Sequence, residues 1–318
     1  MKYYVGIDLG GTNIAVGVVN EEYEIVGRGK LKTNVPRPAE EIVDDMVKAT
    51  HLALENAGVT MDQIEWIGIG SPGIANKATG VLEFSGNLDF YNVPLVGMME
   101  DRVHKKVYLE NDANAAAYAE ILAGSAKGCR DAIVITLGTG VGSGIIIDGK
   151  IYSGFNYAGA ELGHMGIVYG GRDCTCGRKG CFEAYCSATG LINITKDHMK
   201  KNPDSKLWEL AEGDIEKVNG RIPYDGMRLG DKAATEAVDE YVNYMAYGLA
   251  SCINIFQPEI LCIGGGISKE GETLLAPLRE KIAKEDFNKD PNKRTKLVAA
   301  KLGNDAGIIG SAFLGNLA

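Results

Sequence analysis

The same pattern of strand, glycine turn and strand occurs twice in this chain. One apolar run begins at Val5 and ends at the turn Gly10-Gly11, and a similar run begins 128 positions later, at Ile133, and ends at the glycine turn of residues 138–140. Each turn leads into a second apolar run, and a third strand follows another short turn. We therefore predict a three-stranded meander in each half of the chain, and a diverged internal duplication is the simplest explanation.

Amphipathic helical segments alternate with further buried strands after each meander. We expect helices at residues 38–57, 113–123 and 232–256, and the last of these lies within a mostly helical region from 187 to 257. We expect strands at residues 64–69, 107–109 and 260–263. Strands that alternate with long helices predict an α/β fold. Together with the repeat, this predicts two lobes, each a mixed sheet flanked by helices, with a cleft between the lobes as the place for ligands.

The composition excludes several classes of protein. The 318 residues include 33 basic and 42 acidic side chains, and the net charge of −9 argues against a nucleic-acid-binding surface. No apolar run approaches the roughly 18 residues of a membrane span, and the N-terminus lacks the features of a signal peptide. Seven cysteines, three of them within residues 174–181, suit a reducing compartment better than a disulfide framework. We expect a cytoplasmic protein without nucleic-acid or membrane partners.

Three glycine turns that follow strands are candidates for phosphate binding, because backbone N–H groups at glycine approach phosphate oxygens without a Cβ in the way. A tight hairpin would also explain any one of these turns, but three in one chain favour a nucleotide. Asp8, beside the first turn, suits the water shell of Mg²⁺. The candidate nucleotide-binding residues are Asp8, Gly10, Gly11, Thr12, Gly138, Thr139, Gly140, Gly264 and Gly265.

A cluster of cysteines gives the most specific local signal. Cys174, Cys176 and Cys181 are separated by segments that contain glycine, and His164 lies ten residues upstream of the first of them. Three thiolates and one imidazole form a closed tetrahedral shell that suits structural Zn²⁺. The other four cysteines have no such grouping, and we expect them in the core.

Three carboxylates lie near these features. Asp112 follows the end of a strand, Glu161 precedes His164 by three residues, and Glu183 follows Cys181 by two. A single carboxylate in such a place is more often a helix cap or a solvated charge. With three candidate phosphate turns, however, the set predicts a polyhydroxyl ligand that is held by carboxylates and amides.

Taken together, these segments resemble the ROK family (repressor, open reading frame, kinase) of sugar kinases, within the actin-like ATPase superfamily. The resemblance covers essentially the whole chain. It rests on Asp8–Thr12, Glu110–Asn114, Leu137–Gly144, Glu161–His164, Cys174–Glu183 and the closing segment Gly303–Ala312. It implies a small lobe of residues 1–115 plus about 303–318, and a large lobe of about 116–302 that contains the zinc site.

The resemblance also implies roles for individual residues. Asp112 would be the catalytic base that takes the proton from the sugar hydroxyl. ATP would contact Thr12, Thr139 and Gly265. His164 would bind zinc through one ring nitrogen and face the sugar with the other. The implied sugar-binding set is Asn87, Asn111, Asp112, Glu161, His164 and Glu183.

The activity implied by the resemblance is ATP- and Mg²⁺-dependent phosphorylation of a hexose at its 6-hydroxyl, as an entry step of glycolysis, by a homodimer. Glucose is favoured over fructose, allose, N-acetylmannosamine and N-acetylglucosamine, because the cysteine segment runs into residues 187–191 as it does in members that phosphorylate glucose. A sugar-sensing repressor of the same family is disfavoured by the acidic charge and by a first strand that begins at residue 3. The zinc cluster argues against a chaperone-type ATPase, and Asp112 argues against a sugar sensor without activity.

Overall fold

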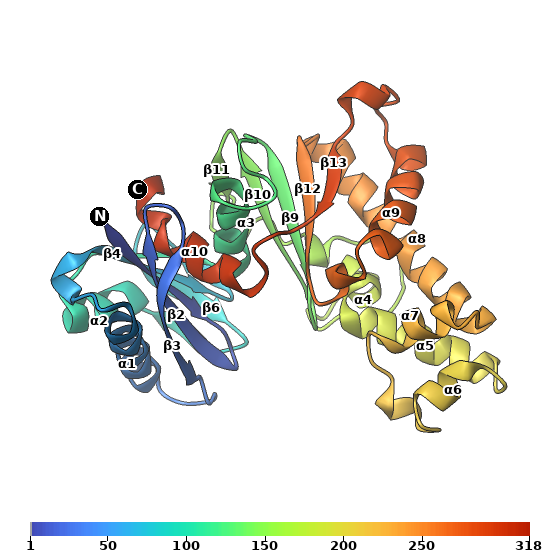
Figure 1. The fold of residues 1–318 in the computed structure, drawn as a ribbon, viewed down its shortest axis with the longest axis horizontal. Coiled ribbons are helices and arrows are strands. Elements are labelled where there is room, and N and C mark those ends of the chain that lie inside the picture. The colour runs from blue at the N-terminus through green and yellow to red at the C-terminus, as the bar shows by residue number, and fades with distance from the viewer. Residues whose placement is uncertain (1) are drawn as a thin grey trace. The chain divides into compact units, whose positions relative to one another are not determined.

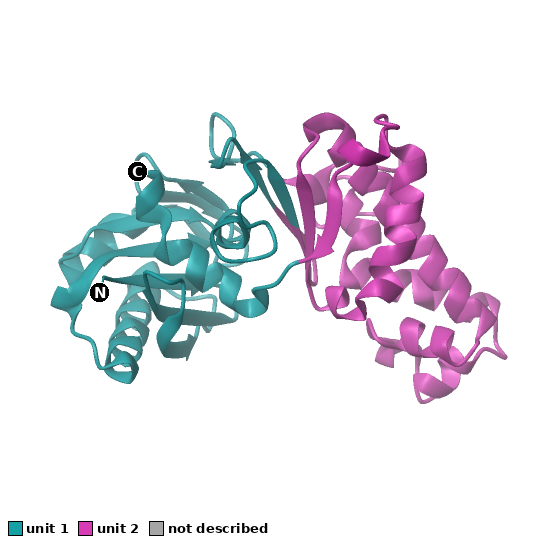
Figure 2. Cartoon of the chain, turned by 45° about the horizontal axis from the view of Figure 1, so that its top comes forward, with its two compact units in different colours: residues 1–134, 144–160, 300–318 teal, residues 135–143, 161–299 magenta. Residues whose placement is uncertain are grey.

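The computed structural model describes residues 2–318, and the chain divides by its internal contacts into two compact units (Figure 2). Unit 1 comprises residues 1–134, 144–160 and 300–318, and unit 2 comprises residues 135–143 and 161–299. This division differs from the lobe boundary expected at residue 115. The reason is that helix α3 (Asp112–Leu122) packs against helix α10 (Ala306–Ala312), and both belong to unit 1.

Unit 1 is built on a five-stranded sheet with the strand order β3-β2-β1-β4-β8. Its strands are β1 (Tyr3–Leu9), β2 (Asn13–Asn20), β3 (Ile25–Lys32), β4 (Ile64–Ser71) and β8 (Val107–Asn111) (Figure 1). The first three form the predicted antiparallel meander, whereas β1, β4 and β8 run parallel. Since the carboxyl ends of parallel strands meet at one edge, Asp8 lies opposite Gly70, and Gly70 lies opposite Glu110.

Helix α1 (Ala39–Ala57) covers β2 and β3 of this sheet. It buries most of the apolar positions that its sequence spacing predicts, among them Ile42, Met46 and Ala53, whereas Leu52 is exposed. The helix ends at Gly58, which adopts the left-handed conformation with φ 66° and serves as the C-cap. The predicted helix is therefore confirmed.

A small antiparallel sheet and a helix between β4 and β8 are absent from the sequence prediction. Their bounds are β5 (Ile74–Asn76), β6 (Val81–Ser85), β7 (Phe90–Val93) and α2 (Leu95–Val103), and the sheet order is β5-β6-β7. Leu82, Leu88 and Leu95 are buried in the same core as the strands of the five-stranded sheet. The turn between β6 and β7 carries Asn87.

The second five-stranded sheet has the topology of the first, as the repeated sequence pattern predicts. Its order is β11-β10-β9-β12-β13. The strands are β9 (Ala132–Leu137), β10 (Val141–Ile147), β11 (Lys150–Tyr152), β12 (Ile260–Gly265) and β13 (Lys296–Ala299). β10 and β11 pair antiparallel, as β2 and β3 do, and β12 and β13 pair parallel, as β4 and β8 do. The turn between β9 and β10 therefore corresponds to the turn between β1 and β2.

Unit 2 contains β12, β13 and the parts of β9 and β10 beside the second glycine turn, and it is otherwise largely helical. Its α-helices are α4 (Phe182–Cys186), α5 (Ala188–Lys201), α6 (Lys206–Leu210), α7 (Ile222–Arg228), α8 (Lys232–Phe256) and α9 (Glu272–Glu285). Helix α8 has the predicted bounds, and its N-cap is Asp231, whose side chain accepts a hydrogen bond from the Ala234 N–H at 2.8 Å. Short 3₁₀ helices lie at Met61–Gln63, Leu162–His164, Ile215–Lys217, Ile267–Glu270, Pro291–Lys293, Gly303–Asp305 and Leu314–Leu317.

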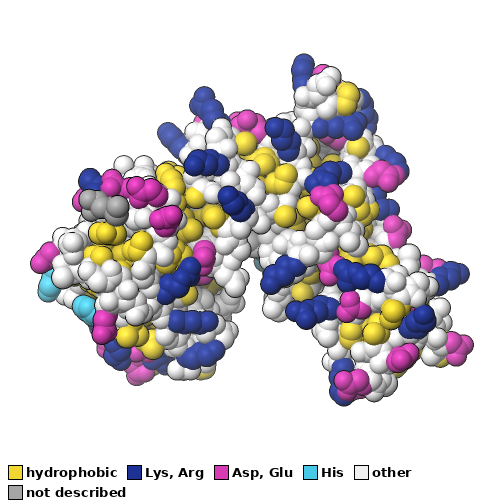
Figure 3. Space-filling view, viewed as in Figure 1, with side chains coloured by type: hydrophobic (Ala, Val, Ile, Leu, Met, Phe, Trp, Pro, Cys, Tyr) yellow, Lys and Arg dark blue, Asp and Glu magenta, His cyan; other side chains and the backbone are white. Residues whose placement is uncertain are grey.

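Basic and acidic side chains are interspersed on the face of the molecule that Figure 3 shows. Within residues 2–318, no helix is both long and apolar enough to span a bilayer.

Candidate active site

The first glycine turn joins β1 to β2 in unit 1 and is anchored by a neighbouring residue. The Thr33 hydroxyl donates to the Gly10 carbonyl at 2.6 Å, and the Thr33 N–H donates to the Thr12 carbonyl at 3.0 Å. Thr12 is exposed at the tip of the turn, while Asp8 is half-buried at the end of β1. The turn therefore presents Thr12 to solvent on a fixed backbone, as a phosphate-binding turn requires.

Asn111 and Asp112 lie where β8 passes directly into α3. Asn111 is the N-cap of α3, and its Oδ1 accepts from the N–H groups of Ala113 at 2.9 Å and Asn114 at 3.1 Å. Its Nδ2 donates to the Gly73 carbonyl at 3.2 Å. These bonds fix the start of the helix, and Asp112 is held at its first position by the rigid strand before it and the capped helix after it.

The environment of Asp8 and Asp112 disfavours their charged forms. Burial and, secondarily, the carboxylate of Asp112 raise the pKa of Asp8 to about 6. Burial also raises the pKa of Asp112, although the backbone N–H of Ala113 partly opposes this by donating to its carboxylate. Two carboxylates with raised pKa values at one edge of a sheet indicate a functional site. Burying both of them lowers the stability of the fold, and a purely structural role does not explain that loss.

Replacing Asp8 with Asn is expected to stabilise the protein in the absence of nucleotide and Mg²⁺. The pKa of Asp8 is about 6 in the folded state and near 3.8 in the unfolded chain. The folded state therefore loses stability as the pH rises from about 4 through about 6, by up to about 3 kcal/mol. Asn carries no charge and removes this cost. Urea unfolding of wild type and Asp8→Asn at pH 8 and pH 4.5 measures the effect.

The urea midpoint of Asp8→Asn is expected to exceed that of wild type by more at pH 8 than at pH 4.5. Asp101→Asn, at an exposed position on α2, removes one charge elsewhere in the same unit and is the matched control. An Asp8→Asn variant that is no more stable than wild type at pH 8 would contradict the raised pKa.

Glu110 directly precedes the candidate site residues Asn111 and Asp112, and its sequence context predicted no role for it. Only 2% of Glu110 is exposed, and its Oε1 accepts from the Asn111 N–H at 2.9 Å and from Asn114 Nδ2 at 3.0 Å. Lys77 places its ammonium group 3.4 Å from Oε2. The buried carboxylate thus ties the end of β8 to the first turn of α3, on either side of Asp112. Its position directly before Asn111 in the sequence was the available signal.

Asn87 lies against the first glycine turn. A Cβ placed on Gly11 would lie 3.1 Å from the backbone oxygen of Asn87, so the β6–β7 turn and the β1–β2 turn are neighbours. Asn87 itself is exposed. Unit 1 therefore brings together Asp8, the first glycine turn, Asn87, Asn111 and Asp112.

The second and third glycine turns lie side by side in unit 2. The second turn joins β9 to β10 and is closed by a hydrogen bond from the Gly138 N–H to the Gly140 carbonyl at 3.0 Å. The third follows β12, and Gly265 adopts φ 90° with its backbone against the Leu137 carbonyl. Only glycine fits there, because a side chain would be strained and would overlap that carbonyl. The predicted residues Gly138, Thr139, Gly140, Gly264 and Gly265 are thus brought together.

Glu161, His164 and Glu183 lie on the segments that flank the cysteine loop, also in unit 2. The His164 N–H donates to the Glu161 carbonyl at 3.0 Å, so both residues belong to one tight turn. Glu183 lies in the first turn of α4, where its Oε2 accepts from the Val141 N–H at 2.9 Å and its Oε1 accepts from the Thr175 hydroxyl at 3.1 Å. The Glu183 carboxylate therefore contacts both the second glycine turn and the cysteine loop, a link that the sequence spacing did not reveal.

The cysteine loop brings four metal-binding side chains together. The ligand atoms of His164, Cys174, Cys176 and Cys181 all lie within 4.8 Å of one another. The Sγ atoms of Cys176 and Cys181 are 3.7 Å apart, and Cys174 Sγ is 3.6 Å from His164 Nδ1. A tetrahedral zinc with Zn–S near 2.3 Å and Zn–N near 2.05 Å requires about 3.8 Å and about 3.6 Å for these separations. Both separations therefore suit a zinc ion, and the four side chains are close enough together to hold a metal.

The backbone of the loop explains how these ligands converge. Gly180 adopts φ 77° and lies against the Val168 carbonyl, where any side chain would overlap. The Cys174 N–H donates to the Arg178 carbonyl at 2.9 Å, which closes the turn between the first and last cysteines. Glycine at position 180 therefore allows the chain to fold back at this point of the loop.

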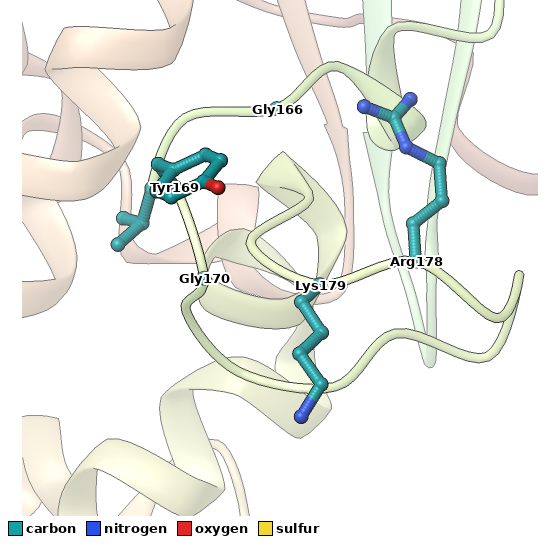
Figure 4. A pocket seen from close by; sticks show the side chains of 6 residues that line it. Gly166, Tyr169, Gly170, Arg178 and Lys179 are labelled. Atoms are coloured by element: carbon teal, nitrogen blue, oxygen red, sulfur yellow. The ribbon is translucent and has the colours of Figure 1, made fainter.

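An open cavity of about 500 Å³ is lined in part by residues of the same loop. Its lining residues are Gly166, Val168, Tyr169, Gly170, Arg178 and Lys179 (Figure 4). The labelled side chains of Tyr169, Arg178 and Lys179 extend in different directions and do not converge on one point. None of the predicted sugar- or nucleotide-binding residues lines this cavity.

Comparison with known proteins agrees with the sequence motifs. The profile of the ROK family matches residues 4–316. The chain belongs to the ROK family.

Individual relatives are similar over most of this chain. Glucokinase of Thermotoga maritima is 38% identical over 312 residues, which cover 98% of this chain and 96% of the relative. The crystal structure of a ROK family glucokinase from Streptomyces griseus, in complex with glucose and AMPPNP, matches 99% of this chain and 100% of its own with a TM-score of 0.83 and 36% identity. A xylose repressor of Caldicellulosiruptor bescii is 32% identical over 292 residues, 89% of this chain and 70% of the repressor.

These similarities confirm the predicted fold class. The two five-stranded mixed sheets with flanking helices are those of the actin-like ATPase fold found in ROK sugar kinases.

Proposed function

We propose that this ROK protein transfers the γ-phosphoryl group of ATP to the 6-hydroxyl of glucose. The observation that carries the proposal is the carboxylate of Asp112, held at the β8–α3 junction beside Asp8, in a chain that is similar to glucokinases over nearly its full length. Phosphoryl transfer requires positioning and electrostatic stabilisation more than covalent participation of the protein. A fixed base next to phosphate-binding turns suits that requirement.

Asp112 is the catalytic base in this proposal. Its carboxylate takes the proton of the sugar 6-hydroxyl while that oxygen forms a bond to the γ-phosphorus. The bond between the γ-phosphorus and the bridging oxygen breaks at the same time, and ADP leaves. The raised pKa of Asp112 brings its basicity closer to neutral pH, where a general base is most effective.

The nucleotide is assigned to the three glycine turns. Their residues Gly10, Gly11, Thr12, Gly138, Thr139, Gly140, Gly264 and Gly265 offer backbone N–H groups and hydroxyls to the phosphates. When bound, Mg²⁺ supplies positive charge to the phosphate oxygens, and Asp8 is the residue that would hold its water shell, since Mg²⁺ prefers carboxylate and water oxygens.

The sugar is assigned to Asn87, Asn111, Asp112, Glu161, His164 and Glu183. Carboxylates and amides of this kind hydrogen-bond sugar hydroxyls, and such sites strongly reject analogues that lack a hydroxyl. His164 Nδ1 belongs to the metal cluster, so Nε2 is the nitrogen that faces the sugar. A bound zinc supplies a rigid tetrahedral anchor at this point, and the chain's own ligands are His164, Cys174, Cys176 and Cys181.

We propose a cytoplasmic homodimer as the working form, in which the thiols of the cluster stay reduced. Twofold dimers are the commonest oligomers of soluble proteins. Light scattering at micromolar concentration is expected to give the mass of two chains, and a monomer mass would contradict this part of the proposal.

A coupled assay for glucose 6-phosphate tests the proposed activity. We expect ATP-dependent product formation with purified protein, Mg²⁺ and glucose. Sugar binding without turnover would instead favour a sugar sensor. The similarity to a xylose repressor is the observation that favours this alternative.

A further inference from the structure

The second glycine turn is hydrogen-bonded to the segment that follows the cysteine loop. The Ala188 N–H donates to the Gly138 carbonyl at 2.9 Å, and the Thr189 hydroxyl donates to the Thr139 carbonyl at 2.9 Å. Glu183 accepts from the Val141 N–H at 2.9 Å. Residues 138, 139 and 141 of the turn are therefore each bonded to a residue within 183–189.

The segment that precedes the cysteine loop supports the same turn from β10. The Leu162 N–H donates to the Ser143 hydroxyl oxygen at 3.0 Å, and the Gly163 backbone packs against the Val141 carbonyl. The two flanks of the metal-binding loop thus enclose the turn. The hydroxyl of Thr189 is the one side-chain donor in this set that bonds a backbone carbonyl at the exposed tip of the turn.

We propose that Thr189 is a positioning residue for the nucleotide, acting through its hydrogen bond to the Thr139 carbonyl. The carbonyl of Thr139 belongs to the peptide unit whose N–H is that of Gly140. Fixing this carbonyl sets the direction in which that N–H points. A turn that binds phosphate through backbone N–H groups loses affinity when these groups are free to rotate, because binding must then order them. The inference rests on the proposed function, since it needs the second turn to bind phosphate.

Thr189→Val tests the inference, because valine has the shape of threonine without the hydroxyl. We expect the KM for ATP and the Kd for a non-hydrolysable ATP analogue to rise about three- to tenfold, the effect of one lost hydrogen bond. The KM for glucose is expected to change less than twofold. Thr189→Ser keeps the hydroxyl and is expected to restore the affinity for ATP to within twofold of wild type.

Thr195→Val is the matched control. Thr195 lies on the same helix, α5, and its hydroxyl bonds the Leu191 carbonyl at 2.8 Å, away from the turn. We expect its KM for ATP to equal that of wild type. The inference is overturned if Thr189→Val changes the KM for ATP less than twofold, changes both KM values equally, or is not rescued by Ser.

The wild-type protein separates failure of this inference from failure of the proposed function. Calorimetric titration with the ATP analogue and the glucose assay are carried out on it first. Absence of nucleotide binding or of phosphorylation in wild type would refute the proposed function itself. Normal wild-type binding with an unaltered Thr189→Val variant would refute only the role of Thr189.

Discussion

Replacing Asp112 with Asn is expected to lower the kcat for glucose phosphorylation by at least about 100-fold, the usual contribution of a general base. Asparagine has nearly the same size and can still accept a hydrogen bond from the Ala113 N–H, so the start of α3 is expected to remain intact. It cannot take the proton of the attacking hydroxyl. The Kd for ADP is expected to change less than twofold, because the glycine turns are unaltered.

Steady-state kinetics at saturating glucose and ATP measure this effect, with Asp101→Asn as a charge-matched control at the exposed face of α2. The pH profile gives an independent readout. Burial raises the pKa of Asp112, so wild-type kcat/KM is expected to fall with acid at a higher pH than an exposed aspartate would dictate. The remaining kcat/KM of Asp112→Asn should no longer show the decrease that protonation of Asp112 causes in wild type. A variant with near-wild-type kcat would remove Asp112 from the role of base.

Removing one ligand of the cysteine cluster is expected to lower the melting temperature by about 10 °C or more. Binding of a structural metal contributes directly to the free energy of folding, and each kcal/mol corresponds to a few degrees in a protein of this size. Cys176→Ser deletes a ligand that lies 3.7 Å from Cys181. The affinity for glucose is expected to fall as well, because His164 and Glu183 are both anchored at this loop.

Elemental analysis and thermal unfolding measure these two effects together. Wild type is expected to carry one zinc per chain and Cys176→Ser none. Cys129→Ser, at a half-buried position outside the cluster, is the matched control and should retain its zinc and its melting temperature. Stoichiometric zinc in Cys176→Ser, or none in gently purified wild type, would refute a zinc site at these residues.

The strands and helices that could be predicted are those with a long or repeated pattern. β1 and β9 are continuous apolar runs that end in glycine turns, and α8 has an apolar face that is sustained over 25 residues and a capping aspartate. β5, β6 and β7 have only three to five residues each and became visible only through their pairing. The first segment of unit 1 extends to residue 134 because α3 packs against α10. These two helices are almost 200 residues apart, so no local sequence pattern indicates that they pack together.

The candidate site shows the same limit. The metal ligands could be predicted because three of the four lie within eight residues, Cys174–Cys181, and thiolates have few other reasons to cluster. The roles of Glu110 and Thr189 could not, because their partners are set by register and turn geometry. Glu110 bonds the residues that flank Asp112, and Thr189 bonds a turn that lies 50 residues earlier in the chain.

The central claim, that glucose is the preferred acceptor, is tested most directly by kcat/KM values for a panel of sugars with ATP as donor. The panel comprises glucose, fructose, allose, N-acetylmannosamine and N-acetylglucosamine, and the position of the new phosphate is read by NMR. We expect glucose to have the highest kcat/KM and to be phosphorylated at its 6-hydroxyl. A kcat/KM for N-acetylmannosamine or fructose that exceeds the value for glucose by tenfold or more would contradict it.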